Sequence, residues 1–117
     1  MDKAAERLKF EEEAWNTRDT ERISEVYADN IEMRDGTVFV NGRSELLHFL
    51  GRKLAGQADL RIKLDLWGAL KARMAVRFEA EWKDHSGRPQ HAYGVQVLQF
   101  NESGEIERRF SSQEVQG

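Results

Sequence analysis

The sequence predicts a single α+β domain in which three helices, grouped toward the N-terminus, lie over a curved antiparallel sheet. Two observations predict this fold. The first half of the chain has mainly helical periodicity, whereas the second half alternates between apolar and polar residues as strands do. Helices followed by long strands are typical of α+β layers with the helices on one face. At 117 residues, one domain over residues 1–117 is expected.

Three segments have the periodicity of amphipathic helices. The first runs from residue 2 to about residue 17, and the second begins after Asp19, a candidate N-cap. The third follows Asn41-Gly42 and should end near Gly56. Their apolar stripes consist of Ala4, Leu8 and Trp15, then Ile23, Val26 and Tyr27, and then Leu46, Leu47, Leu50 and Leu54.

Strands are expected over most of the remaining chain. Residues 31–40 should form two short strands broken at Asp35-Gly36. Longer strands are expected at residues 60–67, 74–82, 89–100 and 105–113.

Charged residues predict the register of the first long hairpin. In the register that we expect, Lys63 faces Glu79, whereas a shift by two residues would set Lys63 against Arg77, which repels. The expected register brings together three opposite charges: Asp65 with Arg77, Lys63 with Glu79, and Arg61 with Glu81. The hairpin loop would then consist of Leu70, Lys71 and Ala72.

The composition argues against several classes of protein. Eighteen basic and 21 acidic residues give a net charge of −3 with no basic block, so nucleic-acid binding is not expected. No apolar run approaches the roughly 20 residues that span a bilayer, and no signal-peptide pattern is seen. The absence of cysteine is compatible with a cytoplasmic location. No metal spacing or phosphate loop appears, and His48, His85 and His91 are weak signals, so no metal or cofactor is expected.

The face of the sheet turned away from the helices is expected to be partly apolar. It should carry the charged residues of the first hairpin together with Trp67, Val95 and Val97. A partly apolar outer face is often a dimer surface, so we expect a homodimer through it. Scattered exposed apolar residues are also normal in monomers, which leaves that alternative open.

Several short motifs occur in a distinctive order along the chain. They are Ala14-Trp15-Asn16-Thr17-Arg18-Asp19, Gly42-Arg43, Phe49-Leu50, Arg52-Lys53, Leu66-Trp67, Ala75-Val76-Arg77-Phe78, Glu81-Trp82, Ser86-Gly87, Tyr93-Gly94 and Arg108-Arg109. Over residues 8–112 this order resembles the nuclear transport factor 2-like (SnoaL-like) superfamily, and within it a bacterial family of unassigned function. The resemblance implies a cone-shaped sheet wrapped around the helices, with a pocket at its open end.

The resemblance narrows the chemistry without naming it, because relatives include isomerases, cyclases, epoxide hydrolases, dehydratases and non-enzymatic binding domains. Aligned with ketosteroid isomerase, Asp35 takes the place of the proton-removing base. Glu11 and Gln96 take the places of the tyrosine and the second aspartate that hold the enolate. Two of the three roles have therefore changed, and a steroid-type isomerase is not expected.

Glu11 and Asp35 are the candidate catalytic residues. Glu11 lies about 50° from the centre of its helix's apolar stripe, where burial would raise the pKa of a carboxyl. Glu12 lies equally close on the other flank, and only the resemblance favours Glu11. Asp35 ends a short strand, although Asp-Gly is also an ordinary turn signal. Two carboxylates in one pocket would serve as acid and base.

The remaining candidates would line the pocket. Arg108 shares strand parity with Ile106 and Phe110, so it should point inward, to hold an anionic substrate or to pair with Asp35 or Glu11. The other expected lining residues are Trp15, Tyr27, Phe39, Phe78, Trp82, Gln96 and Leu98. The expectation is a protein that binds a small, largely apolar molecule, as an enzyme of proton-transfer or water-addition type. The alternative is a non-catalytic ligand-binding or dimerisation module.

Overall fold

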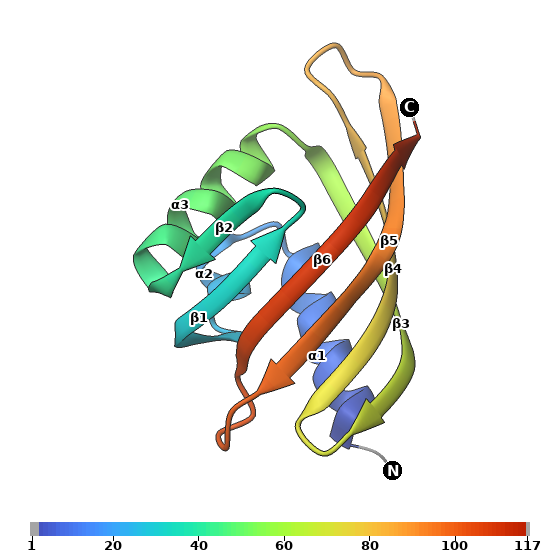
Figure 1. Cartoon of the computed structure of the whole chain (residues 1–117). Helices are drawn as coiled ribbons and strands as arrows, with labels where there is room; N and C mark the ends of the chain where they lie inside the picture. Colours follow the sequence, from blue (N-terminus) through green and yellow to red (C-terminus); the bar gives the residue numbers. More distant parts are fainter. Residues whose placement is uncertain (1–2, 117) are drawn as a thin grey trace.

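The computed structural model describes residues 3–116, so residue 2 of the expected first helix lies outside the described part. The elements are α1 (Lys3–Asn16), α2 (Thr20–Ser24), β1 (Tyr27–Asp35), β2 (Val38–Asn41), α3 (Gly42–Ala55), β3 (Ala58–Leu70), β4 (Arg73–Lys83), β5 (Pro89–Phe100) and β6 (Ile106–Gln116). They form the predicted α+β fold (Figure 1). No helix within residues 3–116 is long and apolar enough to cross a bilayer.

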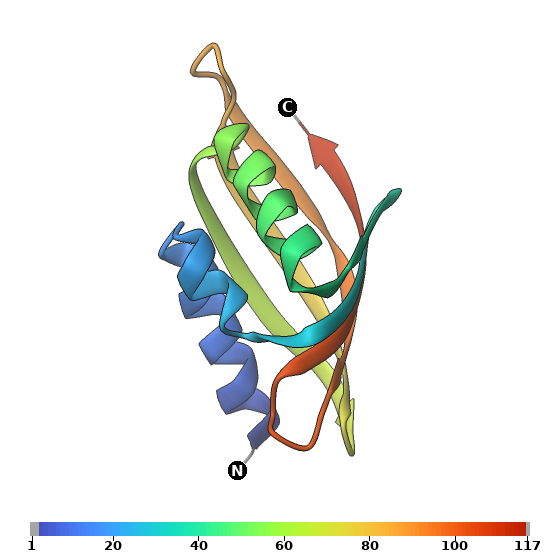
Figure 2. The same ribbon diagram turned by 90° about the vertical axis from the view of Figure 1, so that its left-hand side faces the viewer.

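The strands form one sheet in the order β2-β1-β6-β5-β4-β3. Figure 2 shows the sheet curving around α1, α2 and α3, which lie on the same side of it. The prediction of a wholly antiparallel sheet is wrong at one point, because β1 runs parallel to β6. Local alternation predicts a strand but not the direction of a neighbour that is distant in sequence, and here the first and last strands meet.

Polar side chains of α1 bind the exposed edge of the sheet at β3. The side chain of Asn16 accepts a hydrogen bond from the backbone of Ile62 and donates one back to it. Glu12, the alternative to Glu11, accepts a hydrogen bond from the backbone amide of Leu64 at 2.8 Å. These bonds satisfy an edge that would otherwise be open to pairing with another chain.

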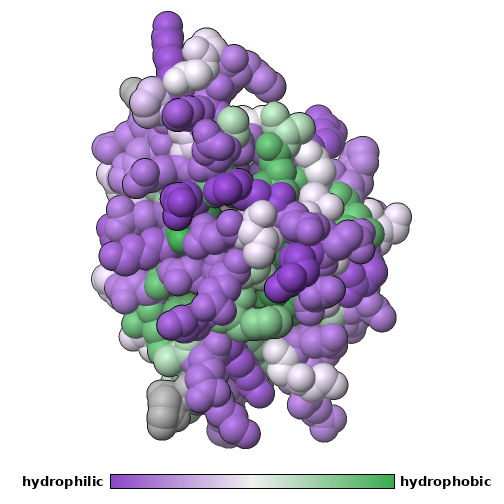
Figure 3. Space-filling model, turned by 180° about the vertical axis from the view of Figure 1, so that it is seen from behind, coloured by the Kyte–Doolittle hydropathy of each residue, from purple (hydrophilic) through white to green (hydrophobic). Residues whose placement is uncertain are grey.

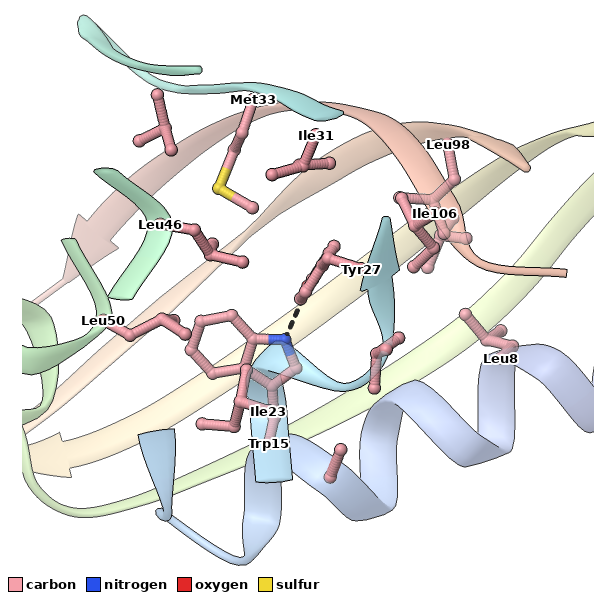
Figure 4. Packing of buried hydrophobic residues seen from close by; sticks show 14 of the residues in the cluster. Leu8, Trp15, Ile23, Tyr27, Ile31, Met33, Leu46, Leu50, Leu98 and Ile106 are labelled. Atoms are coloured by element: carbon pink, nitrogen blue, oxygen red, sulfur yellow. Dashed lines mark hydrogen bonds between the residues drawn. The ribbon is translucent and has the colours of Figure 1, made fainter. Parts of the chain in front are cut away.

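The core lies between the helices and the concave face of the sheet (Figure 4). The indole nitrogen of Trp15 donates a hydrogen bond of 2.9 Å to the hydroxyl of Tyr27 within it. Asp19 caps α2 as predicted, by accepting hydrogen bonds from the amides of Glu21 and Arg22. The second helix is shorter than its periodicity suggested and ends at Ser24. Tyr27 instead begins β1, because the chain there pairs with β6 through a bond from the amide of Ile106 to the carbonyl of Val26.

The predicted register of the β3–β4 hairpin is confirmed, with all three opposite-charge pairs facing one another. The predicted three-residue loop is wrong. A bulge at Trp67 shifts the register after Leu66, so Leu70 pairs with Arg73 and only Lys71 and Ala72 form the turn.

A second register shift changes the facing of the last strand. Phe100 pairs with Ile106, but Gln99 pairs with Arg108, so Glu107 is the extra residue of a bulge. The residues after it change faces, which makes the predicted inward direction of Arg108 wrong. Arg108 is exposed and pairs with Glu32 at 3.2 Å. Its neighbour Arg109 points inward and is buried.

Candidate functional site

A small cavity lies on the concave side of the sheet. It is lined by Glu11 and Trp15 of α1, Asp35 of β1, Lys53 of α3, Gln57, Leu60, Ile62 and Leu64 on and before β3, Phe78, Ala80 and Trp82 of β4, Gln96 of β5, and Arg109 and Gln113 of β6. Its volume is about 30 Å³. Because one water occupies about 10–15 Å³ on this scale, the cavity has room for about two waters. An organic ligand would have to extend beyond it.

Glu11 lies at the inner end of the cavity, where the apolar stripe of α1 carries it between Leu8 and Trp15. It is only 1% exposed. Tyr27 donates a hydrogen bond to Oε2 at 2.8 Å, and Gln96 donates one to Oε1 at 3.1 Å. Burial raises the pKa of Glu11 above its usual value, although nearby Arg109 and the two donors act in the opposite direction. The expectation that Glu11 is desolvated is confirmed.

Tyr27 supports Glu11 from the core. Burial and the neighbouring Glu11 raise the pKa of Tyr27 well above its usual value, so the phenol keeps its proton and remains a donor. A chain of hydrogen bonds therefore runs from the indole of Trp15 through Tyr27 to the carboxylate of Glu11.

Arg109 connects the two candidate carboxylates. Its Nε donates a hydrogen bond to Oε1 of Gln96 at 3.0 Å and lies 3.8 Å from Oε2 of Glu11. Its Nη1 lies 3.7 Å from Oδ2 of Asp35. One guanidinium is thus within 4 Å of both carboxylates and couples their charges.

Asp35 lies nearer the surface and has a second cationic neighbour. Its Oδ2 is 3.9 Å from Nζ of Lys53 on α3, and both side chains are largely buried. Burial lowers the pKa of Lys53, whereas Asp35 acts to raise it. The site therefore contains two carboxylates and two cationic side chains, with Asp35 and Lys53 nearer its mouth and Glu11 at its inner end.

Two buried polar atoms of the cavity lining have no hydrogen-bond partner among the described residues. They are Nη1 of Arg109, a donor, and Oε1 of Gln57, an acceptor. Unpaired buried polar atoms are uncommon in folded proteins, since each costs about 1–3 kcal/mol. Nη1 of Arg109 has only the longer ionic contact with Asp35 at 3.7 Å, so both atoms can still form a hydrogen bond with a bound molecule.

The structure brings six of the ten predicted site residues to the cavity: Glu11, Asp35, Trp15, Phe78, Trp82 and Gln96. Tyr27 lies behind Glu11, and Leu98 belongs to the core. The predictions for Phe39 and Arg108 are wrong as regards the interior. Phe39 is 62% exposed and lies beside Arg34 on the outer face of β2, and Arg108 also lies on the outer face.

Arg109, Lys53 and Gln57 were not predicted as site residues. Helical spacing was a usable signal for Lys53, which follows Leu46 and Leu50 on the same stripe of α3. For Arg109, the signal was the outer-face position expected for Val97. Val97 pairs with Phe110 in the sheet, so Phe110 shares the outer face with Val97. The preceding residue, Arg109, therefore points to the inside. Within residues 3–116, no group of three or more His, Asp or Glu side chains is placed to hold a metal ion.

Comparison with known proteins gives a family and a fold. The family model described as "Protein of unknown function (DUF1348)" matches residues 1–116. No curated protein matches the sequence.

Solved structures resemble this chain at low sequence identity. An NTF2-like protein of unknown function from Burkholderia pseudomallei gives a TM-score of 0.85 at 16% identity, covering 97% of this chain and 92% of that chain. The epoxide hydrolase/cyclase-like enzyme SalBIII gives 0.84 at 18%, covering 96% and 91%. RV0760c from Mycobacterium tuberculosis, in complex with estradiol-17beta-hemisuccinate, gives 0.80 at 15%, covering 92% and 91%. The chain therefore has the nuclear transport factor 2-like fold, as the resemblance predicted.

The raised pKa of Glu11 predicts a pH-dependent stability. The folded protein holds the Glu11 proton more tightly than the unfolded chain, so this group's contribution is fully present below the usual pKa of 4.5 and lost as the pH rises through the raised value. The difference in unfolding free energy between wild type and Glu11→Gln should therefore fall as the pH rises from 4.5. Urea denaturation of both proteins at several pH values measures this difference in unfolding free energy. Glu13→Gln, an exposed change on the same helix, should show no such trend, and equal trends in both variants would refute the assignment.

The two adjacent arginines should differ sharply in their importance for stability. Arg109→Met leaves Glu11 buried without its cation and should destabilise the protein by about 3 kcal/mol. Arg108→Met removes an exposed pair and should cost about 0–1 kcal/mol. Adding Glu11→Gln to Arg109→Met should restore part of the loss, as measured by chemical denaturation. Similar losses for the two single variants would show that the inward arginine is misassigned.

Proposed function

We infer a function from the site itself, because the chain belongs to DUF1348, a family described as proteins of unknown function. We propose that it is an enzyme that binds a small, largely apolar molecule at this cavity and transfers a proton to or from it, or adds water to it. Asp35 would be the base, and Glu11 would be its buried partner. The observation that carries this proposal is the placement of both carboxylates within 4 Å of Arg109 in one cavity.

The arrangement suits acid–base chemistry near the mouth of the cavity. Asp35 is the more exposed carboxylate and is the one that a substrate would reach first. When Asp35 takes up a proton, its attraction for Arg109 weakens. The unpaired Nη1 can then donate to a substrate oxygen that gains negative charge. Glu11 shares the same guanidinium and holds it in place from the other side.

Apolar walls and similar folds support a small organic substrate. Trp15, Phe78 and Trp82 contribute aromatic surface to the cavity, and such surface is typical of sites for apolar molecules. The similar structures include an epoxide hydrolase/cyclase-like enzyme and a protein solved with a steroid derivative. Their low identity to this chain supports the class of ligand rather than a particular reaction.

A second candidate function is non-catalytic binding of the same kind of molecule. This function is favoured by the ion pairs of Asp35, because a carboxylate held by both Lys53 and Arg109 can serve to stabilise the structure. The small volume of the cavity also fits a site that grips one end of a ligand.

The outer face of the sheet supports the proposal of a homodimer. Trp67, Val95, Val97 and Phe110 are exposed there, and a hollow of about 530 Å³ lies between Leu70 and Phe110. The side of the molecule that carries α1 is mostly hydrophilic and shows only small apolar patches (Figure 3). Apolar surface gathered on one face is best covered by a second copy of that face, which a two-fold axis provides.

We also retain the proposals that residues 1–117 form one domain and that the protein is bacterial and cytoplasmic. The lack of cysteine is compatible with a reducing compartment.

The proposed activity can be tested by combining a binding screen with solvent exchange. A thermal-shift screen of apolar compounds with oxygen functions should yield molecules that stabilise the wild type. With those molecules in D₂O or in ¹⁸O-labelled water, the wild type should incorporate the isotope into the compound. Asp35→Asn should slow incorporation by at least about 100-fold, because general base catalysis contributes that much. NMR and mass spectrometry measure the incorporation.

Asp65→Asn is the matched control for this experiment, since Asp65 is exposed on the outer face of β3 and should leave the rate unchanged. Compounds that bind the wild type without isotope incorporation would support the binding module and contradict the enzyme. Equal rates for wild type and Asp35→Asn would remove Asp35 from the mechanism.

The proposed dimer predicts a mass of twice the chain by light scattering after gel filtration. Val97→Lys places a charge in the centre of the apolar outer face and should give a monomer. Val38→Lys changes a comparably exposed valine on another face, so this variant should remain a dimer. A monomeric wild type would contradict the proposal.

A further inference from the structure

A groove between β2 and α3 adjoins the cavity. It has a volume of about 760 Å³ and is lined by Asp35, Val38, Phe39, Val40, Ser44, Glu45, His48, Phe49, Arg52 and Lys53. Asp35 and Lys53 line both the groove and the cavity, so the two spaces meet at this pair. Small-molecule sites usually measure about 300–1,000 Å³. The groove is therefore large enough for the body of an organic ligand, whereas the cavity accommodates only a small group at its end.

The walls of the groove suit a flat apolar body. Val38 is exposed on β2 and shares strand parity with the buried Val40, so it faces α3, where Phe49 is half-buried. Phe39 has the opposite parity and lies on the outer face, where the guanidinium of Arg34 is 4.5 Å from the centroid of its ring. A flat hydrocarbon ring placed here would contact Val38 and Phe49 and remove their apolar surface from water.

The cavity offers one hydrogen-bond donor and one acceptor that have no hydrogen-bond partner among the described residues. Nη1 of Arg109 donates no hydrogen bond and has only Asp35 near it, at 3.7 Å, and Oε1 of Gln57 accepts no hydrogen bond. The side chain of Arg109 is only 9% exposed, so a group that completes its hydrogen bonding has to enter the cavity. A hydroxyl is the smallest group that accepts from one atom and donates to the other, and it fits a cavity of about 30 Å³.

The charges of the site favour a neutral group over an ionised one. Glu11 and Asp35 are matched by Lys53 and Arg109, so the four groups balance when all are charged. A carboxylate on the ligand would add an uncompensated buried charge, which is costly. A ligand that enters the cavity between Asp35 and Lys53 breaks no hydrogen bond between these two side chains, because Nζ of Lys53 and Oδ2 of Asp35 are 3.9 Å apart.

We propose that the ligand of this protein is an alcohol or phenol with a flat apolar body. Its hydroxyl lies between Arg109 and Gln57, and its body lies in the β2–α3 groove against Val38 and Phe49. This inference rests on the proposed function, because it names the class of molecule that the same site would bind. It places Asp35 beside the oxygen-bearing end of the ligand.

Three matched probes test the inference on the intact chain. They are 2-naphthol, which accepts and donates, 2-methoxynaphthalene, which only accepts, and 2-naphthoate, which is an anion. In amide NMR titrations, 2-naphthol should shift the resonances of residues 38–40 and 53–57. It should bind at least about tenfold more tightly than either of the other probes, since each of them leaves the acceptor of Gln57 unpaired.

Two variants separate the hydroxyl contact from the groove contact. Gln57→Met should remove the preference for 2-naphthol over 2-methoxynaphthalene, and Val38→Ala should weaken the binding of both probes by a similar factor. Gln116→Met, at the exposed end of β6, should change neither affinity. The Gln57 variant and the groove variant alter residues that take no part in the proposed proton transfer, so their effects on binding do not depend on catalysis.

A failure of this inference can be distinguished from a failure of the proposed function. Equal binding of the three probes in the groove would refute the hydroxyl contact and leave the role of Asp35 intact. Shifts confined to other surfaces, or none with any probe, would refute the site itself. The isotope exchange of Asp35→Asn decides the enzyme proposal in either case, because it uses compounds selected without reference to a hydroxyl.

Discussion

The interior of this protein depends on one buried cation, the guanidinium of Arg109. It lies against the ring of Trp15, donates to Gln96, and is within 4 Å of Glu11 on one side and of Asp35 on the other. An isolated carboxylate as deeply buried as Glu11 would be very costly, and Arg109 together with the donors from Tyr27 and Gln96 offsets that cost. The helix, the first strand and the last strand are thereby linked through a single side chain.

This interaction depends on a single extra residue in the last strand. The bulge at Glu107 turns Arg109 inward and Arg108 outward, and without it the exposed arginine and the buried one would exchange places. The parallel pairing of β1 with β6 then brings Asp35 to the same guanidinium. The proximity of the two carboxylates is therefore a result of sheet topology, because α1 and β1 do not themselves place Glu11 beside Asp35.

The same arrangement explains why the site is both closed and incomplete. Two carboxylates and two cations balance one another, which allows them to be buried, yet Nη1 of Arg109 and Oε1 of Gln57 each have no hydrogen-bond partner among the described residues. Surrounding aromatic and aliphatic side chains restrict access of water, so polar contacts made there are stronger than at the surface. A balanced site with one free donor and one free acceptor suits a neutral polar group better than an ion.

Sequence alone determined the properties that depend on local periodicity. The helical stripe of α1 predicted the burial of Glu11, the alternation in β3 and β4 predicted their inner faces, and facing charges predicted their register. The resemblance of ordered motifs predicted the fold and named Asp35. Tertiary structure alone decided the contacts of Asp35, the inward direction of Arg109, the exposed position of Phe39 and the parallel pairing of β1 with β6. The physical reason is that strand periodicity has only two phases. One bulge inverts the phase, and no local pattern reports which distant strand will lie alongside.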